Sequence, residues 1–440
     1  MSGTSGYVVV ERRPRPLSPL REHLRDTFWF APVVGLVGAA VLAWACGGVD
    51  VWIVDVLRGT GDDGLLREAV RFTGDAKGIV SMVGPAMLTF IGVVFSISLV
   101  AMQMVSGQWS QRVMRLYVRN RITKGTFSAF LATFVFALLV QTQYDTERDI
   151  RYVTAVPVAT SAVAVGLVVL SLLLFIAYVN SIMKLMRVSH VLDRIAKEAA
   201  GTLGADAEPY EGEPPPPYDR VVSYRGRSGV LRDVHVARLV RIARRHGVVL
   251  HLLPRIGDFL VPGTPVFGVS GEARGRLGAR GLCAALSAGV ERTFHQDLGF
   301  GLRQLADIGL RALSPAVNDP TTAVQCVDRI EQFLGTAAAR PLGVLLHRDR
   351  GGGVRLAQDL PDWASLVDLG FAELRTAAAG NPQVSRRLAA ALDDLLRLAP
   401  EERARPLREN RRLLERAVLA RVHDPDEQRF ALEADRQGIG

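Results

Sequence analysis

The chain has 440 residues, enough for two or three domains; 49% of them are hydrophobic and only 22% are charged. Together with a mean hydropathy of +0.19, this balance argues against a wholly soluble protein and predicts one that is part membrane and part soluble. The net charge of +9 comes from arginines spread along the chain, so it gives no sign of a nucleic-acid partner.

Four apolar segments predict a four-helix transmembrane domain over residues 28–188, preceded by a basic N-terminal segment, residues 1–27. The expected spans are Phe28–Cys46, Ile79–Val105, Thr126–Val140 and Val153–Met183. We expect the first span to stay uncleaved, because Trp44 suits a signal-cleavage site poorly. The three cysteines, Cys46, Cys283 and Cys326, fit neither a zinc site nor a disulfide framework and are expected to be buried thiols.

The distribution of arginines predicts the orientation in the membrane. Residues 11–26 carry five arginines, and "QRVMRLYVRNRITK" (111–124) carries four and a lysine. The loop "QTQYDTERDIRY" (141–152) has only two arginines. Since basic segments stay in the cytoplasm, both termini are predicted to be cytoplasmic, in a multi-pass protein of the bacterial inner membrane.

The second span carries a stripe of small and polar residues on one helical face. Its members are Thr89, Gly92, Ser96, Gln103, Gly107 and Ser110, with Pro85 and Val100 on the same face. Small residues let helices pack closely, whereas hydroxyl and amide groups also suit a hydrated path. Close packing and a pore lining therefore remain alternative interpretations.

The second half predicts a mixed α/β, mostly helical cytoplasmic domain. A Pro-rich linker over residues 189–219 leads to a small α/β unit, residues 220–271. Residues 272–340 form a helical hairpin region, expected to be helical from Leu282 and to turn at "SPAVNDP". Residues 341–440 begin with a strand-like pair and continue as helices. No lysine follows Lys197, which excludes lysine-borne cofactors and a phosphate-loop lysine from this half.

Polar residues gather on and beside the helix that precedes the "SPAVNDP" turn. They are His295, Asp297, Arg303, Asp307, Arg311, Asn318 and Asp319. A hydrogen-bonded network that braces the hairpin, a ligand site and a catalytic site are the alternatives. The set is too small in ligands for a metal assignment. The sequence therefore assigns no catalytic, cofactor-binding or metal-binding residue, and it predicts no cofactor.

Two long segments resemble a known family. They are "GVVFSISLVAMQMVSGQWSQRVMR" and "FHQDLGFGLRQLADIGLRALSPAVNDPTTAVQCVDRI". Both are similar to the bacterial predicted membrane proteins of the domain of unknown function 2254 family, over roughly residues 20 to 425. The resemblance implies a polytopic membrane protein with a cytoplasmic domain. It implies no activity and no site residues.

Three functions remain open from the sequence. The polar stripe favours a homo-oligomeric channel or permease-like conduit, gated by the cytoplasmic domain and passing an ion or a small molecule. The alternative is a membrane-anchored sensor or scaffold whose cytoplasmic domain binds a protein or small ligand. An enzyme comes third, since the chain lacks a nucleophile–base motif and we expect it not to be one. In each case the lipid bilayer is a partner and no nucleic acid is expected.

Overall fold

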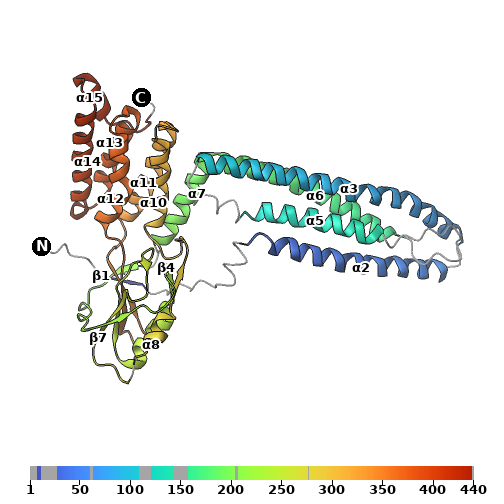
Figure 1. The fold of residues 1–440 in the computed structure, drawn as a ribbon, viewed down its shortest axis with the longest axis horizontal. Helices are drawn as coiled ribbons and strands as arrows, with labels where there is room; N and C mark the ends of the chain where they lie inside the picture. The colour runs from blue at the N-terminus through green and yellow to red at the C-terminus, as the bar shows by residue number, and fades with distance from the viewer. Residues whose placement is uncertain are drawn as a thin grey trace. The chain divides into compact units, whose positions relative to one another are not determined.

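The structure is a computed structural model that describes residues 7–10, 27–59, 63–108, 120–141, 157–203, 207–275 and 277–438. The chain divides into two compact units, one formed by Pro19–Arg187 and the other by Met1–Ser18 together with Val188–Gly440. The first unit holds the four long apolar helices, and the second holds both sheets and the remaining helices (Figure 1).

The first unit is a bundle of four helices that are long and apolar enough to cross a membrane. They are α2 (Phe30–Gly59), α3 (Asp63–Gln108), α5 (Arg121–Gln141) and α6 (Val158–Met186). The expected spans are thus confirmed as helices with shifted bounds. The largest difference is in the first span, Phe30–Val56, which continues through Gly47 and Gly48 because apolar residues resume at once after them.

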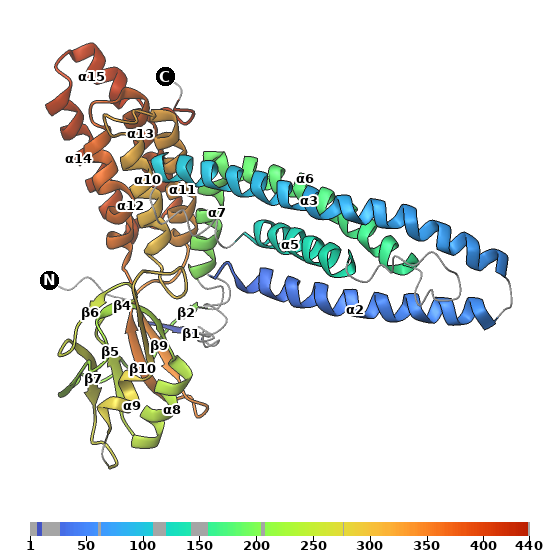
Figure 2. The ribbon, with the colours of Figure 1, turned by 45° about the vertical axis from the view of Figure 1, so that its right-hand side comes forward.

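Helix α5 lies at the centre of this bundle, between α2 on one side and α3 and α6 on the other (Figure 2). Its Phe130 and Phe136 are fully buried. Small residues let α2 approach closely: a Cβ on Gly35 would overlap the Oγ of Ser128 in α5. The Ser128 hydroxyl in turn donates to the Ala31 carbonyl at 2.8 Å.

The second unit contains a seven-stranded mixed sheet in the order β2-β1-β9-β10-β5-β7-β3. Its strands are β1 (Tyr7–Val10), β2 (Ala207–Pro209), β3 (Arg220–Ser223), β5 (Val249–Leu252), β7 (Pro265–Ser270), β9 (Val344–Arg348) and β10 (Val354–Asp359). Helix α8 (Val236–His246) packs on β5, β9 and β10 through Leu239, Val240 and Ala243. The α/β part therefore extends well beyond residues 220–271.

Strand β1 lies within the basic N-terminal segment, residues 1–27, where no strand was predicted. Val8 pairs with Leu345 of β9 in a parallel ladder and with Pro209 of β2 in an antiparallel one. β1 precedes the first candidate span, whereas β9 follows the fourth. Strands of one sheet must share a compartment, so the N-terminal strand and the domain after the spans lie on the same side of the membrane.

A second sheet, with three strands in the order β6-β4-β8, corrects the prediction of helix from Leu282 onward. Its strands are β6 (Phe259–Leu260), β4 (Gly229–Val234) and β8 (Leu286–Gly289). The short helix α9 (Ala279–Cys283) ends before β8, and the next helix begins only at Phe300. Pairing of Leu231 with Ala288 across the sheet outweighs the local helical pattern.

The rest of the second unit is an array of helices, which Figure 2 shows side by side at one end of this unit. They are α7 (Val188–Ala200), α10 (Phe300–Ala312), α11 (Pro320–Ala338), α12 (Trp363–Ala378), α13 (Pro382–Leu398), α14 (Glu401–Arg421) and α15 (Pro425–Leu432). Helices α12, α13 and α14 agree with the expectation that helices follow the strand-like pair of residues 341–440.

Helix α7 corrects the predicted linker, residues 189–219. It buries Leu192 and Ile195 and packs on α10 and α11. Only Arg187, in an extended conformation, separates α7 from the last span, helix α6. The proline run 214–217 forms neither helix nor strand, as expected of a linker. It lies after α7 and so does not directly follow the last span. The link that follows the fourth span is therefore a single residue.

Candidate functional site

The stripe predicted on the second span lies on an exposed face of α3. Thr89, Gly92, Ser96 and Gln103 are all exposed. At 100° per residue this face is roughly opposite the buried face of the same helix, which is formed by Val80, Val83, Met87, Val94 and Ala101. A Cβ on Gly92 would meet nothing within 4 Å. Packing within one chain therefore does not account for the stripe.

The exposure of two further members of the stripe is not described. Gly107 belongs to the last turns of α3, and Ser110 lies outside the described residues. Of the others, Thr89 has a partner in its own helix, because its hydroxyl donates to the Pro85 carbonyl at 3.1 Å. Such a bond lowers the cost of facing lipid. Gln103 carries an exposed amide on the same face.

The interior of the bundle contains polar contacts that were not predicted from the sequence. The Tyr178 hydroxyl of α6 lies 2.5 Å from the Ser98 hydroxyl of α3 and donates to the Val94 carbonyl at 3.0 Å. Thr133 and Ser171 join α5 and α6 at 3.1 Å. The sequence signal that could have indicated these contacts is a tyrosine within the otherwise very apolar α6. These pairs satisfy one another, as buried hydroxyl groups require.

Asp50 is a buried acidic residue of α2 whose carboxylate caps another helix. It accepts the backbone N–H of Ala159 at 2.8 Å and that of Thr160 at 3.2 Å, and it also accepts the Thr160 hydroxyl. These donors open helix α6, whose own N-cap residue is Pro157 and gives no side-chain cap. The carboxylate therefore stabilises the start of the last span.

The polar cluster predicted between residues 295 and 319 separates into three sets. The first lies in the loop before α10. Asp297, 2% exposed, accepts two hydrogen bonds of 2.8 Å from the Arg292 guanidinium. Burial raises the pKa of the Asp297 carboxyl, and the bonds from Arg292 oppose that rise. The same loop contacts β4: His295 Nε2 lies 3.3 Å from the Asp233 carboxylate, and Gln296 Nε2 donates to it at 2.5 Å.

The second set joins two helices. Arg303 of α10 donates to Asp307 one turn away at 2.7 Å and to both Glu373 oxygens of α12 at 2.6 and 2.9 Å. The bonds with Glu373 raise the pKa of the Arg303 guanidinium and lower that of the Glu373 carboxyl. Arg303 thus links α10 to α12.

The third set is the turn between α10 and α11. Arg311 lies in the last turn of α10, where a cation is favourable beside the helix carbonyls. Asn318 adopts a left-handed conformation with φ of 47°. Asp319 caps α11 by accepting the Thr322 N–H at 3.0 Å, and Pro320 opens the helix. Among the described residues no group of three His, Cys, Asp or Glu could hold a metal ion.

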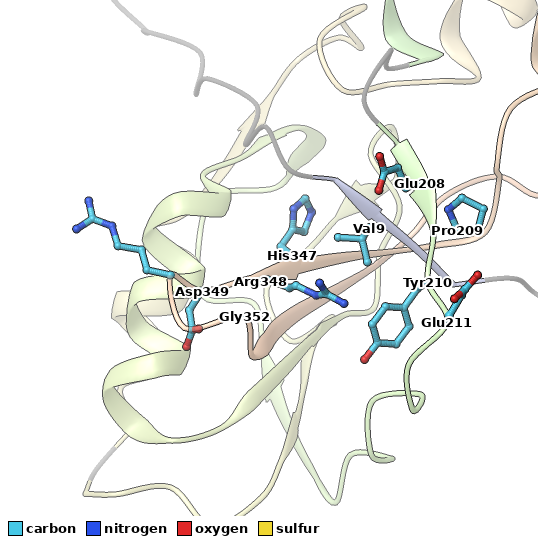
Figure 3. A pocket seen from close by; sticks show the side chains of 10 residues that line it. Val9, Glu208, Pro209, Tyr210, Glu211, His347, Arg348, Asp349 and Gly352 are labelled. Carbon is cyan, nitrogen blue, oxygen red and sulfur yellow. The ribbon is translucent and has the colours of Figure 1, made fainter.

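A cavity of about 810 Å³ lies at the β2-β1-β9 edge of the large sheet and was not predicted. Figure 3 shows Tyr210, Glu208 and Glu211 on one side of it, with Arg348 and Asp349 opposite. The Arg348 guanidinium carbon lies 5.2 Å from the centre of the Tyr210 ring, a cation–π distance. Three segments that are distant in sequence line this cavity, so no local sequence motif predicts it.

A smaller hollow of about 220 Å³ adjoins the same β9–β10 turn and opens beside α8. Its lining residues are Ala237, Val240, Arg241, Arg244, Asp349 and Arg350. Asp349 is held within the turn: it accepts Arg355 Nε at 2.8 Å and the N–H groups of Gly351 and Gly353 at 2.9 and 3.2 Å. The bond from Arg355 holds the pKa of the Asp349 carboxyl below its usual range.

Comparison with known proteins confirms the family resemblance. A family model described as "Predicted membrane protein (DUF2254)" matches residues 25–394. The uncharacterized proteins Rv1290c of Mycobacterium tuberculosis and Mb1321c of Mycobacterium bovis are each 28% identical over 432 residues. Each alignment covers 94% of this chain and 79% of the mycobacterial protein. No solved structure matches this chain.

Proposed function

The chain belongs to the DUF2254 family of predicted membrane proteins, and we propose that it forms a homo-oligomeric conduit through the membrane. The observation that carries this proposal is the exposure of the α3 stripe opposite the packed face of that helix. In the proposed oligomer this face of α3 from each copy lines the central axis.

The cost of exposing polar groups to lipid supports this arrangement. A hydroxyl such as that of Ser96, well inside the candidate span Lys77–Met104, lacks water in the hydrocarbon layer, and apolar surroundings cannot replace its hydrogen bonds. Neighbouring copies or a water-filled axis would supply partners for Gln103 and Ser96. The stripe contains no acid or base, so it suits passive flow of a small ion or solute better than proton coupling.

The packing of one bundle favours a path between copies. Its interior is occupied by large buried side chains, among them Phe130, Phe136, Tyr178 and Met87. Four helices packed around such side chains leave the outer face of α3 as the surface for a shared path. The transported ion or molecule is expected to be small.

The way the chain connects the two units supports the proposal that the second unit gates the conduit. The single residue Arg187 separates helices α6 and α7, so a movement of α7 is transmitted to the last span over a very short link. Strand β1 provides a second connection, since it precedes α2 and pairs within the large sheet. The arginine distribution supports a cytoplasmic location for this unit in a bacterial inner membrane.

Planar-bilayer recordings on the full-length protein test the conduit. Wild type should conduct, and Ser96→Leu and Gln103→Leu should each lower the conductance by about tenfold or more by narrowing and drying the axis. Phe95→Leu is the control, since Phe95 is exposed on α3 about 100° around the helix from Ser96. Native mass spectrometry in lipid should show an oligomer. A monomer, or conductance that is equal in all four proteins, contradicts the proposal.

The sensor interpretation remains the second candidate because the second unit offers the two hollows beside the β9–β10 turn. A sensor would bind a ligand without conducting. The combination of no conductance in wild type and saturable ligand binding would favour the sensor over the conduit.

A further inference from the structure

We propose that the hollow between α8 and the β9–β10 turn binds a phosphate-bearing anion, through Arg241, Arg244 and Arg350. This inference does not depend on the conduit, because it concerns binding by the second unit alone. The hollow has a volume of about 220 Å³, which is large enough for one or two phosphate groups.

The charge of the hollow is the first argument. Three arginines line it, and α8 contributes no acidic residue along "VARLVRIARRH". The single acid in the lining, Asp349, is already neutralised by Arg355 and by two backbone N–H groups of its own turn. The lining therefore has an excess of positive charge, and its one acid is held in a pair with Arg355.

The absence of partners for these arginines is the second argument. Within the described ranges, the guanidinium groups of Arg241, Arg244 and Arg350 form no ion pair and no hydrogen bond. Several other arginines of the same unit are paired, although exposed ones such as Arg245 and Arg416 also form no ion pair among the described residues. The pairs include Arg303 with Glu373, Arg387 with Asp328, Arg411 with Asp393 and Arg436 with Asp394. Three unpaired guanidinium groups around one concave surface repel one another unless an anion joins them.

The placement on rigid elements is the third argument. Helix α8 is fixed at both ends: the His235 ring accepts the Arg238 N–H at 3.3 Å, and Gly247 closes the helix with φ of 71°. Arg241 and Arg244 stand one turn apart on this helix, and Arg350 comes from the turn that faces it. Guanidinium groups held in this way can donate paired hydrogen bonds to phosphate oxygens.

A simpler explanation covers only part of the pattern. Basic residues in the last turn of a helix stabilise its negative end, which accounts for Arg244, Arg245 and His246. It does not account for Arg241, which lies in the middle of the helix, or for Arg350, which lies in another element. Convergence of these two with Arg244 on one hollow is what a binding site requires.

The test is isothermal titration of the full-length protein in a neutral detergent with pyrophosphate, at constant ionic strength. Wild type should bind about one pyrophosphate per chain. Arg241→Gln and Arg350→Gln should each raise the Kd by about tenfold or more, the usual cost of a lost charged hydrogen bond. The matched control is Arg245→Gln, which removes the same charge from the same helix outside the lining and should change the Kd by less than about twofold.

Two results would overturn the proposal: no saturable binding by wild type, or equal weakening in all three variants, which would indicate unspecific charge attraction. A second arm identifies the source of the phosphate. The titration is repeated in nanodiscs of phosphatidylcholine alone and with phosphatidylglycerol. A pyrophosphate Kd that rises with the anionic lipid in wild type but not in Arg241→Gln identifies a lipid headgroup as the ligand, because repulsion by the anionic surface alone would raise both. An unchanged Kd identifies a soluble phosphate compound.

Discussion

Gly301 of helix α10 lies directly against Ala199 of helix α7, and a Cβ on Gly301 would overlap the Cβ of Ala199. The "GFGLRQ" segment therefore has a packing role: its second glycine lets the helix that follows the last span approach α10. This contact belongs to the array of helices that begins one residue after α6.

Gly301→Ala should destabilise the second unit by about 1–3 kcal/mol, because the added methyl group forces α7 and α10 apart. Hydrogen exchange of α10 peptides in the full-length protein measures the effect locally. Gly335→Ala is the control: its Cβ would lie 3.8 Å from the nearest Leu398 carbon, and alanine favours a helix, so stability should hold or rise. Equal behaviour of the two variants would contradict the packing role.

Asp319→Ala should cost about 1 kcal/mol by removing the side-chain cap of α11, and faster exchange of the first turn of α11 should report the loss. Asp319→Asn keeps an acceptor in place and should retain most of the stability. If the asparagine variant loses as much as the alanine variant, the role of Asp319 extends beyond capping.

Arg387 makes a buried link between α13 and α11. It is 6% exposed and donates to Asp328 at 2.7 Å and to Glu331 at 2.5 Å. Arg387→Met leaves both carboxylates without their cation and should lower stability by roughly 2–4 kcal/mol. Arg408→Met removes an exposed pair with Glu401 and should cost less than about 1 kcal/mol. Thermal unfolding in detergent compares the two, and similar shifts would contradict this ranking.

Glu373 should make stability depend on acid pH. Arg303 holds the pKa of the Glu373 carboxyl below its usual range, so the folded state favours the ionised form. The stabilisation is complete above the unfolded-state pKa of about 4.3 and is lost as pH falls through the folded-state pKa. Glu373→Gln should therefore be less stable than wild type at pH 7, with the gap closing as pH falls toward 3. A gap of constant size would argue against this linkage.

The two cysteines of the second unit should react very differently with a maleimide. Cys326 is fully buried in α11, and burial raises the pKa of its thiol far above the ordinary value. Cys283 is only partly buried. Native protein should be labelled at Cys283, and Cys326 should react only after denaturation. Rapid labelling of Cys326 in native Cys283→Ser protein would show that α11 opens readily.

Local patterns in the sequence were sufficient for some elements and misleading for others. The apolar runs predicted the four membrane helices, and "SPAVNDP" predicted the turn before α11, because both signals lie within a few neighbouring residues. Strand β8 was missed, since Leu286–Gly289 becomes a strand only by pairing with β4, more than fifty residues earlier in the chain.

The candidate sites show the same limit. The stripe on α3 could be found from helical periodicity, but the face of α3 that packs inside the bundle could not, because it depends on α5 and α6. The seven polar residues looked like one cluster because they are close in sequence. Their partners Arg292, Asp233 and Glu373 divide them into separate contacts. The arginine hollow combines α8 with a distant turn, so only the folded chain reveals it.

The place of β1 in the large sheet has a consequence for how the protein is made. Strand β1 leaves the ribosome first, and its neighbour β9 emerges only after all four spans have been synthesised. The N-terminal strand must therefore wait, unpaired, while the helices insert. A long wait of this kind slows folding and leaves a strand edge open to wrong partners. A fusion that hinders β1 would consequently disturb a domain encoded on the other side of the four spans.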